Sequence, residues 1–371
     1  MTSLRLSLSA YRVPLPRTAA NAQTSWSERS GLLLTLKDEQ GVWGQGEAAP
    51  LPGYADDSLE HTEHALRSCR PDALADAFAM DLSQLGARFV EALPLSTPSA
   101  RFALETAFFD WVARRRGEPL YRVLRAVAGI ERRPLSAVPL AALIDLGSDA
   151  ISSARRAVAR GFSTLKVKVG RGSAEPLAEQ HFAEELDALL ALRRTVGPQV
   201  SLRLDANRAF LPEALGARLA ALAVVAPEFV EEPGVDPGSW PLHPAVPVAL
   251  DESLRSGFAW SRTQCVERRI AAAVLKPGTL GGILTTLELA ARVESSGLIP
   301  IVSHAFEGPV GFAAACELAL ALGVTSRAAG LGPHLALQPW SDALPPSLAG
   351  AELVPHLEPG LGLRQLTGVS L

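Results

Sequence analysis

The chain has 371 residues, a formal net charge of −4 and a hydrophobic fraction of 48%. This composition can bury a large core, which excludes a disordered chain, and the length is typical of about two to three domains. Because a nucleic-acid-binding domain needs a basic face, we expect no nucleic-acid partner.

Membrane, disulfide and zinc-site classes are also excluded by simple patterns. No apolar stretch reaches the length of about 18 residues that a membrane-spanning helix needs, so we expect no membrane partner. Cys69, Cys265 and Cys316 are far apart and lack Cys-x-x-Cys spacing, which predicts neither a disulfide framework nor a zinc site. We expect a soluble protein of a reducing compartment, the cytoplasm, and these patterns leave its oligomeric state open.

The first hundred residues predict an α+β domain. Residues 4–13 and 31–37 alternate between apolar and polar side chains as antiparallel strands do. Helical patterns follow at residues 57–69 and 99–116. Strands followed by helices are typical of an α+β domain, which we place over residues 1–98.

From residue 138 onward, short apolar runs alternate with helical patterns. The runs lie at residues 138–144, 164–169, 200–204, 228–230, 246–250, 271–275, 298–302 and, more weakly, 327–331. Eight strands separated mainly by helices favour a modified (β/α)8-type, TIM-like barrel over residues 99–337. A doubly wound open sheet is the alternative, although no G-x-G-x-x-G motif is completed after Gly170. The last segment, residues 338–371, is predicted to return to the N-terminal domain.

Three consecutive strands of this barrel end in a carboxylate, namely Asp205, Glu231 and Asp251. Active sites of such barrels lie at the carboxyl ends of the strands, so the three side chains would meet there and repel one another unless a cation lay between them. Ligation by oxygen alone indicates Mg²⁺, with Mn²⁺ as the alternative. Each acid could instead cap the helix that follows its strand.

Lysines flank this acidic set on two other strands. Lys166 and Lys168 are two residues apart, so they share one face of their strand, and Lys276 ends the sixth strand. Because burying two ammonium groups against apolar helices is costly, we expect both to face the barrel mouth. A lysine crowded by other cations has a lowered pKa and can serve as a general base. Schiff-base chemistry also uses a barrel lysine, but it does not need a carboxylate metal site.

At these positions the chain resembles the enolase superfamily, in its muconate-lactonizing-enzyme-like branch. The motifs, in chain order, are Lys166-x-Lys168, Asp205-x-Asn207, Glu231-Glu232-Pro233, Asp251-Glu252-Ser253 and Lys276-Pro277. The stretch from Gly44 to Gly53 is similar to the capping domain of o-succinylbenzoate synthases. The resemblance covers nearly the whole chain, and it implies that residues 1–98 are a capping domain.

The resemblance implies a role for each residue of this set. The ligands of Mg²⁺ would be Asp205, Glu231 and Asp251. Lys168 would remove the proton next to the carboxylate of a small-molecule substrate, Lys166 would tune the pKa of Lys168, and Lys276 would stabilise the developing anion. The implied reaction is the syn-dehydration of 2-succinyl-6-hydroxy-2,4-cyclohexadiene-1-carboxylate to 2-succinylbenzoate in menaquinone biosynthesis. An N-succinylamino-acid racemase or dipeptide epimerase with the same machinery is the alternative, and a non-catalytic barrel would be expected to have lost part of it.

Four further residues are candidates for contacts around this centre. Asn207 would orient the metal site, and Arg203 would neutralise a substrate carboxylate or serve as a salt-bridged barrel residue. Ser303 and the backbone N–H of Gly308 would bind the substrate after strand seven. His304 is either a catalytic base, as in mandelate-racemase-like members, or a residue that lines the pocket. Residues 18–29, with Trp26, resemble the capping loop that closes over the site.

Overall fold

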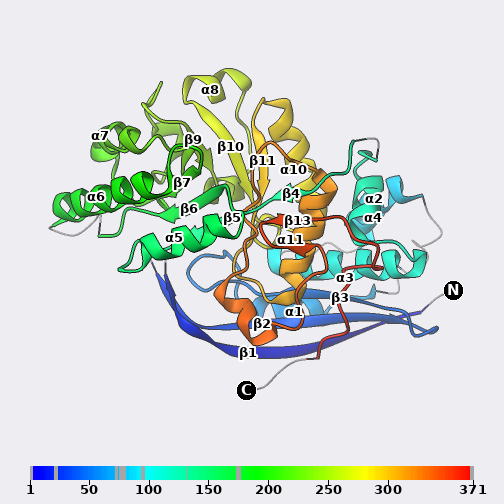
Figure 1. Cartoon of the computed structure of the whole chain (residues 1–371). Coiled ribbons are helices and arrows are strands. Elements are labelled where there is room, and N and C mark those ends of the chain that lie inside the picture. The colour runs from blue at the N-terminus through cyan, green and yellow to red at the C-terminus, as the bar shows by residue number, and fades with distance from the viewer. Residues whose placement is uncertain are drawn as a thin grey trace.

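The computed structural model describes residues 3–20, 24–71, 74, 81–92, 97–131, 133–172 and 177–367. An antiparallel sheet of three long strands forms the base of the molecule (Figure 1). Its strands, in the order β1-β2-β3, are β1 (Leu4–Ala20), β2 (Ser25–Asp38) and β3 (Trp43–Ala48). Of the predicted capping loop, residues 21–23 lie outside the described residues.

Four helices accompany this sheet: α1 (Leu59–Arg67), α2 (Leu82–Ala92), α3 (Pro98–Arg116) and α4 (Leu120–Val127). The α3 helix lies across β3, and a side chain at Gly46 would collide with the carbonyl oxygen of Ala103. Glycine therefore lets strand and helix backbones approach closely. The α3 helix ends at Gly117, whose left-handed conformation (φ 67°) is the usual helix stop.

Seven parallel strands form the barrel in strict chain order. They are β5 (Ala141–Ile144), β6 (Thr164–Lys168), β7 (Ser201–Asp205), β8 (Phe229–Glu231), β9 (Val248–Leu250), β10 (Ile270–Leu275) and β11 (Ile299–Val302). The helices around it are α5 (Ala150–Ala159), α6 (Ala178–Val196), α7 (Pro212–Leu222), α8 (Arg262–Glu267), α9 (Pro277–Leu280), α10 (Ile283–Ser295) and α11 (Pro309–Leu322). The predicted TIM-like barrel with an N-terminal α+β unit is confirmed.

The weakly predicted eighth strand is reduced to two isolated parallel bridges. Ala329 pairs with Leu140, and Gly330 pairs with Ser303, so this segment lies between β11 and β5. A Cβ atom at Gly330 would lie 2.6 Å from Ser303 Oγ, so a larger residue would push the segment away from β11. The close packing explains why so short a pairing closes the sheet.

Three short strands, β4 (Val138–Pro139), β12 (Leu348–Ala349) and β13 (Glu352–Leu353), form a third sheet in the order β12-β13-β4. The C-terminal segment then runs down to the base sheet (Figure 1), where Gln45 and Leu366 exchange two hydrogen bonds. The domain boundary between residues 98 and 99 stays a prediction, and residues 368–371 of the predicted C-terminal return lie outside the described residues.

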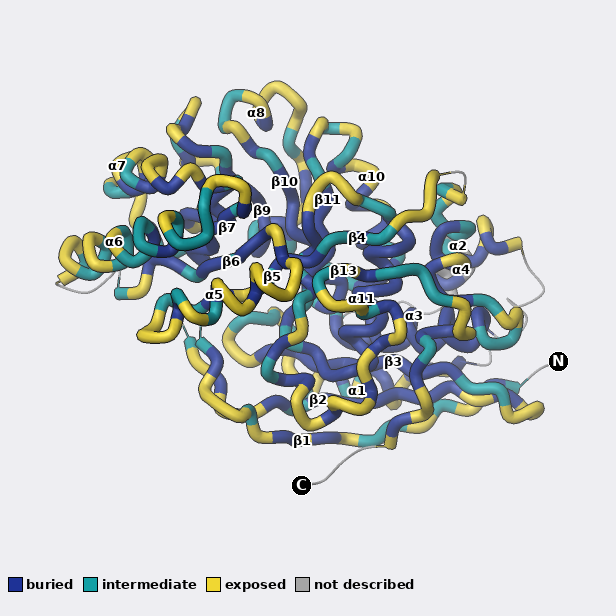
Figure 2. Tube along the Cα trace, viewed as in Figure 1, coloured by how far each residue is buried: buried dark blue, intermediate teal, exposed yellow. Residues whose placement is uncertain are grey.

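Burial follows this architecture, with the dark interior of Figure 2 running through the barrel and across the layer of α3 and α11. A small separate cluster of buried residues inside the barrel consists of Phe229, Ala249, Ala272 and Ile301, and we call it the barrel floor. No helix within the described ranges has the length and apolar character needed to cross a membrane.

Candidate active site

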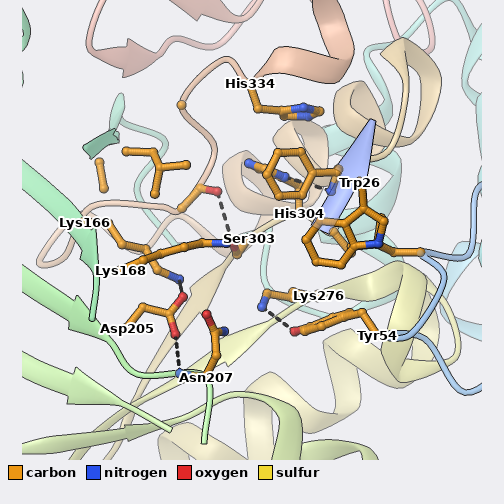
Figure 3. A pocket seen from close by; sticks show the side chains of 17 residues that line it. Trp26, Tyr54, Lys166, Lys168, Asp205, Asn207, Lys276, Ser303, His304 and His334 are labelled. Carbon is orange, nitrogen blue, oxygen red and sulfur yellow. Dashed lines mark hydrogen bonds and ion pairs between the residues drawn. The ribbon is translucent and has the colours of Figure 1, made fainter. Parts of the chain in front are cut away.

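A pocket of about 710 Å³ lies at the carboxyl ends of the barrel strands, against the capping loops (Figure 3). The residues that line it include three lysines, one carboxylate and one amide, together with aromatic and histidine rings. These are Lys166, Lys168, Lys276, Asp205 and Asn207, and then Trp26, Tyr54, Phe306, His304 and His334. The strand ends thus bring all three predicted lysines together.

Lys166 joins two of the predicted metal ligands. Its Nζ atom lies 2.9 Å from Asp205 Oδ2 and 2.7 Å from Glu231 Oε1. The register explains the contact, because Asp205 and Glu231 are direct partners on β7 and β8. Burial alone lowers the pKa of Lys166, but the two carboxylates outweigh it and raise that pKa well above its usual value. Lys166 therefore stays an ammonium ion at the pH of the cell.

Lys276 faces it from β10 and holds the third carboxylate. Its Nζ atom contacts Asp251 and donates to the hydroxyl of Tyr54 over 2.6 Å. Burial opposes the charge of Lys276, yet Asp251 and the acids around it raise the pKa of Lys276. Tyr54 comes from the loop after β3, so a residue outside the barrel touches the catalytic end of the pocket.

Lys168 has a different environment from the other two lysines. Its Nζ atom donates to the carbonyl oxygen of Ala20 over 2.7 Å and lies 5.9 Å from the centre of the Phe306 ring. Burial lowers the pKa of Lys168, and the positive charges of Lys166 and Lys276 add to this against the opposing effect of Asp205. Of the three lysines, Lys168 is the one whose surroundings favour the neutral amine, which a general base needs.

The three carboxylates, Asp205, Glu231 and Asp251, are all buried. Burial and the adjacent Asp205 raise the pKa of Glu231 well above its usual value. Nearby, Glu252 Oε2 is buried with no hydrogen-bond partner in the described part of the chain. An oxygen-only donor set with excess negative charge fits a hard cation such as Mg²⁺. Within the described residues no three acidic, histidine or cysteine side chains are arranged as a complete metal cage, and the carboxylates pair instead with Lys166 and Lys276.

The loops after these strands hold their shape through strained backbone. Asn207, Glu232 and Phe306 have positive φ angles of 44°, 40° and 58°. Asn207 donates its side-chain amide to Glu252 over 3.1 Å and its backbone N–H to Asp205 Oδ1 over 3.2 Å. Such conformations cost about 1–3 kcal/mol each and persist where the surrounding contacts determine them. Asn207 thus links Asp205 to Glu252, and its role in orienting a metal site stays a prediction.

Glu232 stabilises the loop that follows β9. It accepts hydrogen bonds from the backbone N–H groups of Asp251 and Ser253 over 2.7 Å and 3.1 Å. Burial and the charge of Glu252 raise the pKa of Glu232 to about 8. Glu232 thus orients Asp251 through its backbone and does not line the pocket.

The other predicted contacts divide between the pocket and the barrel floor. Ser303 lines the pocket, with its hydroxyl donating to the Gly330 carbonyl oxygen over 3.0 Å. Arg203 lies deeper, where its Nε atom is 2.8 Å from Glu228 and its guanidinium covers the Phe229 ring at 5.0 Å. The geometry of Arg203 is that of the salt-bridged barrel residue, the second of the two roles expected for it.

Gly308 is not among the residues that line the pocket. Its backbone N–H donates to Glu47, which also accepts from the N–H groups of Val310 and Gly311 over 3.0 Å and 2.9 Å. Glu47 also accepts a hydrogen bond from the hydroxyl of Tyr11. The anion at this helix start is therefore a protein carboxylate from β3.

Sequence reasoning missed two features of the site. The contact of Tyr54 with Lys276 leaves no periodic signal in the sequence. His334 stacks on His304 with ring centres 4.1 Å apart, and its one signal is its place just after the weak eighth strand. His304 lines the pocket, which is one of its two expected roles.

Residues 149–365 match the family model described as enolase C-terminal domain-like. Residues 4–110 match the model described as MenC, N-terminal domain. The chain belongs to the enolase superfamily. We call the N-terminal unit the capping unit, because it contributes Trp26 and Tyr54 to the pocket at the carboxyl ends of the barrel strands.

The chain is similar to curated relatives with different activities. An o-succinylbenzoate synthase of Thermosynechococcus vestitus is 34% identical over 197 residues, which cover 53% of this chain and 50% of that protein. A hydrophobic dipeptide epimerase of Citrifermentans bemidjiense is 27% identical over 334 residues, which cover 85% of this chain and 84% of that protein. The first relative therefore aligns over about half its length.

Solved structures agree with the fold. The muconate lactonizing enzyme of Pseudomonas fluorescens complexed with muconolactone has a TM-score of 0.80 at 21% identity, covering 98% of this chain and 96% of that chain. The dipeptide epimerase of Methylococcus capsulatus complexed with Mg and the dipeptide L-Arg-D-Lys has a TM-score of 0.75 at 24% identity, covering 98% and 99%. The predicted superfamily and its muconate-lactonizing-enzyme-like neighbourhood are confirmed.

Proposed function

We propose that this protein is an o-succinylbenzoate synthase, which dehydrates 2-succinyl-6-hydroxy-2,4-cyclohexadiene-1-carboxylate in menaquinone biosynthesis. The observation that carries the proposal is the charge of the pocket wall. Its described lining holds three lysines and a single carboxylate, Asp205, which lies at the lysine end. Because Asp205 already pairs with Lys166, the described lining leaves no carboxylate for a free ammonium group of a substrate, which favours a substrate whose two ends are both carboxylates. The match of the N-terminal unit to the MenC model supports the same activity.

Lys168 performs the proton transfers in this proposal. As the neutral amine, it takes the proton from the carbon that bears the substrate carboxylate. The Lys276 ammonium, held by Asp251 and Tyr54, stabilises the negative charge that develops on the substrate. Lys168 then returns the proton to the leaving hydroxyl on the same face, so water departs by syn elimination and the ring becomes aromatic.

The proposed metal ligands are Asp205, Glu231 and Asp251, and the metal is Mg²⁺, with Mn²⁺ as a substitute. When bound, the ion supplies a Lewis acid for the substrate carboxylate. The replacement Asp205→Asn keeps the shape of the side chain and removes its charge, so we expect the affinity for Mn²⁺ to fall about tenfold or more. Titration of free Mn²⁺ by electron paramagnetic resonance measures this, and unchanged affinity would exclude Asp205 as a ligand.

Racemisation of N-succinylamino acids is the second candidate, because Lys168 and Lys276 reach one pocket from β6 and β10 on different sides of the barrel. A racemase needs an acid–base group on each face of the substrate carbon. A dipeptide fits less well, since its ammonium group needs a carboxylate partner. A neighbouring groove, which Lys168 and His334 also line, holds the carboxylate of Asp145, but this group is already paired with Arg17 over 2.7 Å.

The deciding experiment incubates purified protein and Mg²⁺ with the cyclohexadiene substrate and follows the ultraviolet spectrum of the aromatic product. We expect rapid conversion that EDTA abolishes. Lys168→Ala should lose turnover by about 10²-fold to 10⁴-fold, whereas Lys37→Ala, which removes an exposed lysine of β2, should not. Lack of conversion by folded, metal-loaded protein, together with solvent deuterium exchange into N-succinylamino acids, would replace the synthase with the racemase.

A further inference from the structure

Two histidines form the wall of the pocket that faces away from the carboxylates. His304 follows β11 and His334 follows the eighth barrel segment, and their rings stack with centres 4.1 Å apart and an angle of 25° between planes. The Phe306 ring lies 5.5 Å from His304 and 5.2 Å from His334. The centre of the same Phe306 ring lies 5.9 Å from Lys168 Nζ, so one phenyl ring contacts both the histidine pair and the proposed base.

The hydrogen bond to His304 fixes its tautomer. The backbone N–H of Phe306 donates to His304 Nδ1 over 3.1 Å, so this nitrogen carries no proton. The neutral ring then bears its proton on Nε2. The described part of the chain makes no other hydrogen bond to the His304 ring, so the Nε2–H group is available to a ligand in the pocket.

The His334 ring makes fewer hydrogen bonds than the His304 ring in the described part of the chain. It is only 9% exposed, and neither Nδ1 nor Nε2 has a hydrogen-bond partner among the described residues. A buried donor or acceptor without a partner costs about 1–3 kcal/mol, so a native structure keeps one only where something pairs with it. The ring lines the pocket, which makes a bound molecule the natural partner.

Both rings are uncharged. Burial lowers the pKa of His334 to about 3, with Arg29 contributing. Burial, the stacked His334 ring and the three lysines hold the pKa of His304 well below its usual value. Two neutral rings beside the Lys166 and Lys276 ammonium groups offer N–H donors to an anion without adding charge of their own.

We propose that His304 and His334 form a subsite whose ring N–H groups bind the terminal carboxylate of a succinyl side arm, while the reacting end of the substrate lies among the lysines. The identity of the substrate in this inference rests on the proposed function. The subsite itself would bind the terminal carboxylate of any substrate that carries a succinyl arm. An ammonium group is disfavoured here, because the described lining around the two rings contains no carboxylate. Trp26 and Phe306 provide the apolar walls that the methylene groups of the arm need.

The test compares two ligands that differ only in that carboxylate. Isothermal titration calorimetry with 2-succinylbenzoate and with 2-butyrylbenzoate separates binding of the terminal carboxylate from binding of the rest of the molecule. In His334→Phe, which keeps the ring stack and loses the N–H, we expect affinity for 2-succinylbenzoate to fall about 10-fold to 100-fold. Affinity for 2-butyrylbenzoate should be unchanged. His334→Gln, which restores an amide N–H, should recover part of the loss, and matching thermal unfolding of both variants shows that they fold.

Equal losses for both ligands, or no loss for either, would overturn the subsite. A second ligand pair, N-succinylphenylalanine and N-butyrylphenylalanine, separates the subsite from the proposed function. If the wild-type protein ignores the benzoate pair but distinguishes the phenylalanine pair through His334, the synthase assignment fails and the subsite stands. If dehydration proceeds and His334→Phe still distinguishes both pairs as the wild type does, the subsite fails and the synthase stands.

Discussion

Lysine is rare in this chain, and most of its lysines gather in one place. Four of the 35 basic residues are lysines, and three of those four line one pocket. Arginine, which carries the remaining positive charges, does not lose its proton in proteins. A position that must alternate between amine and ammonium therefore requires lysine, while surface charge does not.

This scarcity makes the pKa of Lys168 directly measurable. In magnesium-free protein labelled with ¹³C at lysine Cε, four signals are expected, and Lys→Arg variants assign them. Because burial and the adjacent ammonium groups lower the pKa of Lys168, its signal should titrate below the usual range of a lysine side chain. Lys166 should remain charged to higher pH, since its carboxylate neighbours raise its pKa.

The sign of the activity profile follows from the same shift. A base must be neutral to accept a proton, so kcat/KM should fall as the pH drops through the lowered pKa of Lys168. If Lys168 titrated in the usual range of a lysine side chain, it would have no special environment, and its assignment as the base would have to be abandoned.

At the scale of elements, buried carboxylates from other parts of the fold occupy the starts of two barrel helices. Glu47 of β3 accepts three N–H groups at the start of α11, and Glu105 of α3 accepts the N–H of Leu284 in the first turn of α10. A helix start exposes unpaired N–H groups with positive partial charge, which a carboxylate satisfies. The capping unit is thus bonded to the barrel through helix ends.

Removing Glu47 should expose the importance of this contact. Glu47→Ala leaves three buried N–H groups and the hydroxyl of Tyr11 without their acceptor, so we expect the free energy of unfolding to fall by about 3 kcal/mol or more. Urea unfolding measures the change. Glu28→Ala on β2 is the matched control, because Glu28 contacts only the exposed Arg12 side chain across the sheet and should leave the midpoint unchanged.

Glu105 predicts a pH dependence of stability. Burial, opposed by Arg101, raises the pKa of Glu105 from 4.5 to about 7. Between these values the folded state binds more protons than the unfolded state, so this residue makes stability fall as the pH rises from about 4.5 to about 7. Glu105→Gln should flatten that part of the urea midpoint profile. A profile as steep as that of the wild type would mean that Glu105 is ionised in the folded protein throughout this range.

The sequence predicted elements better than contacts. Apolar runs placed all seven barrel strands to within a few residues, because burial on both faces leaves a continuous signal. The sequence left two roles open for Arg203, because a strand pattern carries no information on depth, and the structure pairs Arg203 with Glu228 beside the Phe229 ring. The anchoring of Gly308 by Glu47 was not predictable, since it depends on how two units far apart in the chain are docked.

At the scale of the whole molecule, the pocket exists only while the capping unit and the barrel stay together. Arg29 of β2 donates to the carbonyl oxygens of Pro50 and Phe306 over 3.0 Å and 2.7 Å. This side chain therefore joins the loop after β3 to the loop after β11. The C-terminal segment adds a second link, because Leu361 donates to Asp110 of α3 over 2.8 Å. Both links cross from the barrel side to the capping side, so each opposes opening of the pocket.

A truncated chain that ends at Gly360 tests the second link. It loses the Leu361 contact, the hydrogen bond from Arg114 to the Leu363 carbonyl oxygen and the pair of bonds between Gln45 and Leu366. We expect the amides of the base sheet to lose protection in hydrogen-exchange mass spectrometry, while those of β6 and β7 keep theirs.

The matched control for this truncation lies in the same segment. Arg364→Ala removes only an exposed ion pair with Asp342, whose side chains are 66% and 67% exposed, so protection of the base sheet should persist. Equal loss of protection in both sheets of the truncated chain would mean that the segment stabilises the molecule as one cooperative unit and not the capping unit in particular. Selective loss of protection in the base sheet, together with weaker binding of 2-succinylbenzoate, would show that the C-terminal segment holds the capping unit over the barrel mouth.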